Sequence, residues 1–124
     1  MSGIKEYIKR GLVYVKSGVP NKIVKVNIAQ INYGGILKDK KILITGGSRG
    51  LGFAIAEKCL KEQAKVCITG RSMDALNSAK EKLGNPQNLY LFEHDVRNFH
   101  TDDKLIHNAR VAMGGIDCLI NNAG

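Results

Sequence analysis

The sequence predicts an α/β fold with a doubly wound parallel sheet, and three observations support that prediction. After residue 40, short apolar runs alternate with segments whose apolar residues recur at helical spacing. Nearly continuous apolar strands are typical of parallel sheets, because helices cover both faces of such sheets. A glycine-rich stretch at residues 45–52 separates the first apolar run from the first helical segment. Strands and helices that alternate in this way form a doubly wound sheet when short connections make right-handed crossovers.

The expected elements follow one another with few residues between them. Apolar runs predict strands at 41–45, 65–69, 89–93 and 116–121. Helical spacing predicts helices at 51–62 and 72–83, and Gly84-Asn85-Pro86 would end the second of them.

A third helix is expected after Thr101, whose side chain can cap it. Asp102 and Asp103 would lie in its first turn, where the helix dipole favours negative charge. Its inner face would consist of Leu105, Ile106, Ala109, Ala112 and Met113. Gly114-Gly115 would end it.

Residues 1–37 are interpreted as a basic extension with a helix and a strand. The chain has a net charge of +8, and residues 1–40 hold eight Lys or Arg against two acidic residues. Apolar residues at helical spacing predict an amphipathic helix over 3–16, and alternation predicts a strand over 23–31 after a turn at 18–21. Three roles stay open: packing on its own domain or on a sister subunit, contact with an anionic membrane surface, or a loose tail. One gapped amphipathic face is too little for stable membrane anchoring.

Composition argues against several classes of protein. With 44% apolar residues the chain can bury a core, and no apolar run approaches the roughly 20 residues of a membrane span. Lysines and an arginine interrupt every apolar stretch of residues 1–20, which excludes a secretory signal there. The basic residues have no aromatic platform, helix-turn-helix or finger pattern beside them, so nucleic acid is not an expected partner.

Cysteines and histidines predict neither disulfides nor a metal site. Cys59, Cys67 and Cys118 are an odd number, widely spaced and on apolar segments, which indicates buried thiols in a reducing compartment. The expected location is therefore the cytoplasm. The histidines have no carboxylate or cysteine partner at ligand spacing, so no metal ligand is expected.

The glycine-rich stretch reads Thr-Gly-Gly-Ser-Arg-Gly-Leu-Gly over residues 45–52. A strand, a glycine-rich turn and a helix N-terminus in that order form an anion site, because backbone N–H groups and the helix dipole point at the ligand. A tight turn with no ligand is the alternative. The position of this turn after the first strand of a βαβ pattern favours phosphate binding and a Rossmann-type fold.

Four motifs make residues 38–124 resemble the short-chain dehydrogenase/reductase family. They are TGGSRGLG at 45–52, the arginine in TGRS after the second strand, Asp95-Val96 after the third strand, and Asn121-Asn122-Ala123-Gly124 after the fourth. They occur in the order and spacing of that family. The resemblance implies an N-terminal cofactor-binding half-domain over residues 38–124, with an incomplete sheet.

The resemblance also implies roles for residues of the glycine loop. Gly46, Gly50 and Gly52 would line the cofactor pyrophosphate, and the backbone of Leu51 would donate to it. Gly52 would also let the helix pack closely on the sheet.

Further roles follow at the ends of the third and fourth strands. Asp95 would accept from the adenine amino group, and Val96 would contact the ring. An aspartate that only caps the next turn is the alternative for Asp95. Asn122, Ala123 and Gly124 would form an elbow beneath the cofactor ribose.

Charge predicts which dinucleotide the site binds. A cofactor without a 2′-phosphate needs an acidic residue at the end of the second strand, where this chain has Gly70. Arg71 and Ser72 follow, and Ser48 and Arg49 lie in the glycine loop. Two guanidinium groups with a hydroxyl between them suit a phosphate dianion. We therefore expect NADP(H), with two solvated surface arginines as the alternative.

The catalytic residues of the family have no counterpart in this sequence. In the family, a Tyr exchanges a proton with the substrate oxygen, and a Lys four residues later lowers the pKa of that Tyr. No Tyr in residues 1–124 has a Lys four residues later. We expect the cofactor-binding part of an NADP-dependent oxidoreductase that acts on a carbonyl, alcohol or enoyl substrate and forms a homo-oligomer when complete. A non-enzymatic NADP(H)-binding module and an inactive truncated remnant are the alternatives.

Overall fold

The computed structural model describes residues 12–14, 23–25 and 34–124, and the chain divides into two units, residues 1–32 and 33–124. Each unit is described by itself. The predicted domain limits, 1–37 and 38–124, stay a prediction.

The described part of the first unit is a pair of short strands. β1 (Leu12–Tyr14) and β2 (Ile23–Lys25) are antiparallel, with Val13 opposite Val24. The predicted helix over 3–16 is therefore wrong at Leu12–Tyr14, where apolar, β-branched and aromatic residues in sequence favour extended backbone. The predicted strand over 23–31 is found at its first three residues. The rest of that helix, the turn at 18–21 and residues 26–31 lie outside the described residues.

The second unit contains a four-stranded, fully parallel sheet in the order β5-β4-β3-β6. Its strands are β3 (Lys41–Thr45), β4 (Lys65–Gly70), β5 (Leu89–Glu93) and β6 (Cys118–Asn121). The chain runs outward from β3 to β5 and then crosses to the other side of β3. The winding therefore reverses between β3 and β6, and ligands of such sheets bind at the carboxyl ends of the strands beside this switch.

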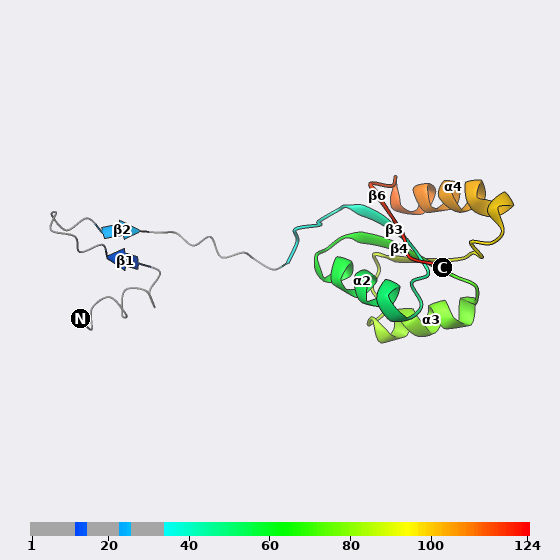
Figure 1. The fold of residues 1–124 in the computed structure, drawn as a ribbon, viewed down its shortest axis with the longest axis horizontal. Helices are drawn as coiled ribbons and strands as arrows, with labels where there is room; N and C mark the ends of the chain where they lie inside the picture. The colour runs from blue at the N-terminus through cyan, green and yellow to red at the C-terminus, as the bar shows by residue number, and fades with distance from the viewer. Residues whose placement is uncertain (1–11, 15–22, 26–33) are drawn as a thin grey trace. The chain divides into compact units, whose positions relative to one another are not determined.

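Helices cover both faces of this sheet, as predicted. α2 (Gly50–Lys61) and α3 (Met73–Lys82) lie on one side and α4 (Asp102–Met113) on the other (Figure 1), with a short 3₁₀ helix, η1 (Phe99–Thr101), before α4. One core packs around Ile44 and Ile68 beneath α2 and α3, and the other packs around Leu43 and Cys67 beneath α4. Neighbouring residues of one strand thus enter opposite cores, because strand side chains alternate between faces. The doubly wound, incomplete sheet is confirmed.

The N-terminus of α4 differs in detail from the prediction. Thr101 precedes the helix, but its side chain does not cap it. Instead the Thr101 hydroxyl donates to the Asn98 carbonyl at 2.8 Å and lies 3.3 Å from Nδ1 of His94. The predicted inner face holds at Leu105, Ala109 and Met113, which are buried. Ile106 is exposed and Ala112 only half-buried.

Strand β6 is an edge strand, and its apolar side chains are poorly covered. It pairs with β3 alone, Leu119 is 48% exposed, and Cys118 is exposed as well. The expectation of three buried thiols is therefore confirmed for Cys59 and Cys67 and wrong for Cys118. The expected strand at 116–121 also starts two residues late, at Cys118. Just before it, Asp117 exchanges two hydrogen bonds with the Lys41 backbone, at 2.8 and 2.9 Å.

A short segment before β3 is fastened to the end of α2. The Ile36 amide donates to the Glu62 carboxylate at 3.3 Å, and the Leu37 amide donates to the Glu62 carbonyl at 3.2 Å. Glu62 is buried and also pairs with Lys58 at 3.2 Å. Within the described ranges, no helix is long and apolar enough to cross a bilayer.

Candidate functional site

A cavity of about 640 Å³ lies at the carboxyl ends of the strands, beside the switch between β3 and β6. All of the predicted site residues line it except Leu51 and Gly52. Five further residues line it that the sequence interpretation did not include among its site residues: Thr69, Gly70, Ala75, His94 and Arg97. Thr69 ends the predicted strand 65–69 and Gly70 follows it, so the sequence indicates the position of both residues. No local signal distinguishes Ala75, His94 or Arg97.

The glycine turn after β3 is held by the neighbouring strand β4. The Gly47 amide donates to the Thr69 carbonyl at 2.9 Å, and the Gly46 amide points at the Thr69 hydroxyl at 3.4 Å. A Cβ on Gly47 would lie 2.5 Å from the Ile68 side chain. Only glycine allows the turn to approach β4 this closely, because any side chain here would overlap a buried residue.

The N-terminus of α2, which follows this turn, is open to an anion. Arg49 precedes the helix with extended backbone, its side chain makes no capping bond, and the first turn contains no acidic residue. The N-terminus of α3 contrasts with it: Ser72 accepts from Ala75, and Glu93 accepts from the Met73 amide at 3.1 Å. The first turn of α2, which reaches the cavity at Gly50, is therefore without a side-chain cap, whereas side chains already satisfy amides of α3.

Two predicted residues of this turn lie outside the cavity lining. Leu51 is 69% exposed, and Gly52 is buried. A Cβ on Gly52 would lie 2.1 Å from the Gly46 carbonyl oxygen. The predicted close approach at Gly52 is thus present, but it is made to the glycine turn itself. The role predicted for Leu51 concerns its backbone amide, which belongs to the first turn of α2.

The elbow after β6 is fixed by a buried hydroxyl of β3. Thr45 Oγ1 accepts from the amides of Asn122 and Ala123, at 3.1 and 3.2 Å, and donates to the Ile120 carbonyl at 3.4 Å. The Asn122 side chain donates to the Gly46 carbonyl at 2.8 Å. One network therefore joins the elbow to the glycine turn, although 76 residues separate Gly46 from Asn122.

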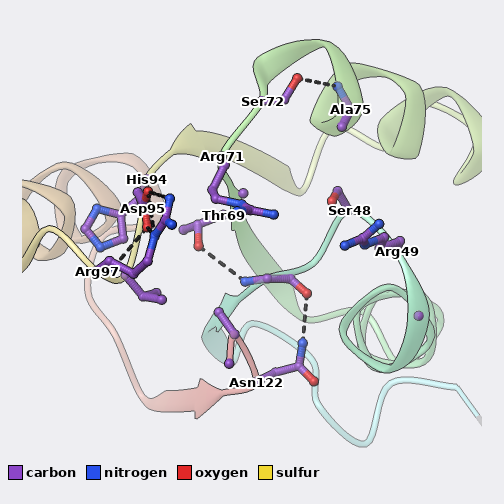
Figure 2. A pocket seen from close by; sticks show the side chains of 16 residues that line it. Ser48, Arg49, Thr69, Arg71, Ser72, Ala75, His94, Asp95, Arg97 and Asn122 are labelled. Atoms are coloured by element: carbon purple, nitrogen blue, oxygen red, sulfur yellow. Dashed lines mark hydrogen bonds and ion pairs between the residues drawn. The ribbon is translucent and has the colours of Figure 1, made fainter.

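Three arginines line the cavity, and they differ in their partners. Arg97 is paired with Asp95, whereas Arg49 and Arg71 have no ion-pair partner among the described residues. In the view of Figure 2, Arg71 lies between the Asp95–Arg97 pair and the loop that carries Ser48 and Arg49. Two unpaired guanidinium groups make this side of the cavity strongly positive.

Asp95 has the turn-capping role that was considered as an alternative. Its carboxylate accepts from the Arg97 amide at 3.0 Å, and its carbonyl accepts from the Asn98 amide at 2.9 Å. The hydrogen bonds from the Arg97 side chain hold the pKa of the Asp95 carboxyl well below its usual range. Asp95 is thus an anion at neutral pH that lines the cavity, and its predicted contact with adenine stays a prediction.

His94 connects the end of β5 to the start of α4. Its ring is buried, with Nδ1 at 3.3 Å from the Thr101 hydroxyl and Nε2 at 2.9 Å from an Asp102 carboxylate oxygen. Its backbone amide donates to the Gly70 carbonyl at 2.8 Å. Both ring nitrogens thus have protein partners. In the part of the chain that the structure describes, no three His, Cys, Asp or Glu side chains gather as a metal site would require.

This arrangement defines a class of protein: a doubly wound α/β domain with a glycine-rich turn and an open helix N-terminus at the switch point of its sheet. The family model described as short chain dehydrogenase matches residues 40–124, and the chain belongs to that family.

Individual relatives agree with this assignment. The chain is 38% identical over 88 residues to an NADP-dependent (R)-specific alcohol dehydrogenase of Lentilactobacillus kefiri, which covers 71% of this chain and 35% of the relative. It is 35% identical over 83 residues to the NADP-dependent 3-hydroxy acid dehydrogenase YdfG of Escherichia coli K12, covering 67% and 33%. The chain thus spans about a third of the length of the curated relatives it matches.

Solved structures show the same fold. A short chain dehydrogenase from Bacillus anthracis is 40% identical with a TM-score of 0.66, covering 71% of this chain and 36% of that one. A short chain dehydrogenase from Mycobacterium smegmatis is 30% identical with a TM-score of 0.68, covering 73% and 39%.

Proposed function

We propose that this chain binds NADP(H) as the cofactor-binding part of a short-chain oxidoreductase. The complete enzyme would transfer hydride between NADP(H) and a carbonyl, alcohol or enoyl substrate. The observation that carries the proposal is the pair Arg49 and Arg71, which line one cavity without a carboxylate partner in the described residues. Unpaired guanidinium groups repel each other, so a phosphate dianion between them would be favourable.

The pyrophosphate would bind at the open N-terminus of α2. Gly46, Gly50 and Gly52 keep the glycine turn free of side chains. The Leu51 amide, in the first turn of α2, would donate to the pyrophosphate. Gly46 and Gly50 have positive φ angles of 72° and 60°. Glycine adopts such angles without strain, so the turn keeps its shape at little cost.

The 2′-phosphate would bind Arg71 and Arg49, with Ser72 and Ser48 as hydroxyl donors. Ser72 Oγ accepts from the Ala75 amide, so the Ser72 hydroxyl hydrogen is free for another acceptor. No acidic residue stands at Gly70, where one would bind the ribose hydroxyls of NAD(H). Two of the relatives, both NADP-dependent enzymes by name, support the same choice.

Adenine and ribose would occupy the remaining two sides of the cavity. Asp95 and Val96 come shortly after β5, and both line the cavity. Asn122, Ala123 and Gly124 line it on the β6 side. We assign adenine to the first group and the cofactor ribose to the second.

A homo-oligomeric complete enzyme in the cytosol is part of the same proposal. The buried free thiols of Cys59 and Cys67 fit a reducing compartment.

Fluorescence titration of the 124-residue chain with NADPH and with NADH tests the cofactor assignment. We expect NADPH to bind about tenfold or more tightly, because a charge-assisted contact contributes roughly 1.5–3 kcal/mol. Arg71→Asp should remove that preference and favour NADH relative to the parent chain. Arg110→Asp is the matched control, since Arg110 is exposed on α4 and does not line the cavity. Equal affinities for both cofactors in the parent chain would refute the assignment.

An activity assay separates a binding part from a complete enzyme. The sequence has no Tyr with a Lys four residues later, so we expect the chain to bind NADPH and to oxidise none with ketones, 3-oxoacyl thioesters or enoyl thioesters. General acid–base catalysis typically contributes about 10² to 10⁴-fold. Turnover that survives repurification and disappears with Gly50→Asp would contradict this expectation. Absence of NADPH binding would instead favour the inactive remnant.

A further inference from the structure

The three arginines of the cavity raise a question about charge, because an acidic residue beside a phosphate site normally competes for its cations. Asp95 and Arg71 line the same cavity, and the Arg71 charge contributes to the low pKa of the Asp95 carboxyl. The Arg71 guanidinium is therefore within electrostatic reach of Asp95. Even so, no ion pair between Arg71 and Asp95 is formed.

Arg97 explains why Arg71 and Asp95 form no ion pair. Its Nε lies 2.9 Å from Oδ1 and 3.1 Å from Oδ2 of Asp95, and its Nη2 donates to Oδ2. Its backbone amide adds a further bond to Oδ1 at 3.0 Å. Both carboxylate oxygens are thus bonded to one planar guanidinium, a geometry that is stronger and more specific than a single contact.

The second acidic residue near Arg71 is engaged in a similar way. Glu93 ends β5 opposite Gly70, the residue before Arg71. Its carboxylate accepts from the Met73 amide at the N-terminus of α3. Each carboxylate beside Arg71 therefore already has a donor of its own, and Arg71 is left without an ionic partner among the residues described.

We propose that Arg97 is a positioning residue for cofactor specificity: by binding Asp95 through both oxygens, it keeps the Arg71 guanidinium free for the 2′-phosphate. The inference rests on the proposed function, because it names what sustains the NADP(H) preference of that site. Arg97 itself does not need to touch the phosphate.

Removal of the Arg97 guanidinium would have two consequences for a 2′-phosphate. Asp95 would present an unneutralised negative charge to the cavity, which repels a phosphate dianion. Arg71, whose charge already acts on the Asp95 carboxyl, would turn to pair with it. Both consequences act on the 2′-phosphate, and NADH has none, so the ratio of the two affinities should change.

Titrations with NADPH and NADH on Arg97→Gln test the inference. We expect NADPH affinity to fall about tenfold or more, which corresponds to the lower end of the range for a charged hydrogen bond, with NADH affinity changed less than about twofold. Arg97→Lys keeps the positive charge and should retain most of the preference. Arg110→Gln, on exposed α4 surface, is the control for loss of an arginine. Circular dichroism checks that each variant is folded.

A double variant distinguishes positioning from general damage. Asp95→Asn in the Arg97→Gln background removes the carboxylate that would capture Arg71. We expect it to restore most of the NADPH-to-NADH affinity ratio, whatever it does to adenine binding, because adenine is common to both cofactors. A ratio that stays low in the double variant would overturn the inference, as would equal losses for NADPH and NADH in Arg97→Gln.

The NADPH and NADH affinities of the parent chain distinguish failure of the proposed NADP(H) preference from failure of the role proposed for Arg97. Equal binding of NADPH and NADH by the parent would refute the proposed NADP(H) preference, and the role of Arg97 would fall with it. A parent that prefers NADPH, with a preference unchanged in Arg97→Gln, would refute only the role of Arg97.

Discussion

Gly52 and Asn122 lie against each other so closely that a Cβ on Gly52 would be 2.6 Å from the Asn122 side-chain nitrogen. The same Cβ would be 2.1 Å from the Gly46 carbonyl oxygen, which accepts the Asn122 hydrogen bond. The first turn of α2, the glycine turn and the β6 elbow therefore meet at one point. Position 52 therefore has room only for glycine, because any Cβ would overlap the Gly46 backbone.

Gly52→Ala should destabilise the fold by about 1–3 kcal/mol or more, because backbone rather than a flexible side chain would have to move. Urea unfolding followed by circular dichroism measures the loss. Gly50→Ala is the comparison: Gly50 has a φ of 60° but open space around its Cβ position. Its cost should be limited to roughly 1–2 kcal/mol of backbone strain. The reverse order of the two variants would contradict the packing argument.

Thr45→Val should also destabilise the fold, although it keeps the shape of the side chain. The Thr45 hydroxyl accepts from the amides of Asn122 and Ala123, and valine would leave both amides without this acceptor. A buried unsatisfied group costs roughly 1–3 kcal/mol. Thr45→Ser keeps the hydroxyl and should recover most of the unfolding free energy. If Thr45→Ser were as unstable as Thr45→Val, the methyl group rather than the hydroxyl would be responsible.

Glu62 should make stability depend on acid pH. The hydrogen bond from Lys58, with a further one from the Ile36 amide, holds the pKa of the Glu62 carboxyl below its usual range. A lowered folded-state pKa means that the stabilisation is complete above the unfolded-state pKa and is lost as pH falls through the folded-state pKa. The difference in unfolding free energy between the parent and Glu62→Gln should therefore be largest near neutral pH and shrink in acid.

Glu57→Gln is the matched control for that experiment. Glu57 pairs with Lys61 on the same helix, but its side chain is 42% exposed, against 7% for Glu62. Exposed pairs of this kind contribute little, so the control should change stability only slightly. A Glu62→Gln effect that is independent of pH would show that the Glu62 charge does not matter.

The open edge at β6 should make the 124-residue chain associate. Leu119 and Cys118 are exposed on a strand whose second edge is unpaired in the described sheet, and such edges favour pairing with another chain. Sedimentation velocity at high micromolar concentration should show species larger than a monomer. Leu119→Lys should reduce association more than Val111→Lys, which adds the same charge on an exposed site of α4. A monodisperse monomer in the parent chain would disprove this prediction.

The strands and helices of residues 41–124 could be predicted because their signals are local. Apolar runs located β3 and β5 with their observed limits, and helical spacing located α2 and α3 within one residue at each end. The glycine turn, Arg71 and the β6 elbow could be recognised because a phosphate site requires particular residues at particular strand ends. Leu12–Tyr14 was misjudged because the same apolar spacing also fits a short strand.

The sequence by itself determined the order of elements, the parallel winding and most of the residues that line the cavity at the carboxyl ends of the strands. Only the tertiary structure decided how these residues bond to one another: Thr45 with the elbow, Arg97 with Asp95 beside a free Arg71, and His94 with Asp102. It also decided that Cys118 is exposed, because burial depends on which elements cover a strand. The physical reason is range: periodicity records the neighbours along a chain, whereas hydrogen bonds and burial depend on segments that folding brings together from far apart in the sequence.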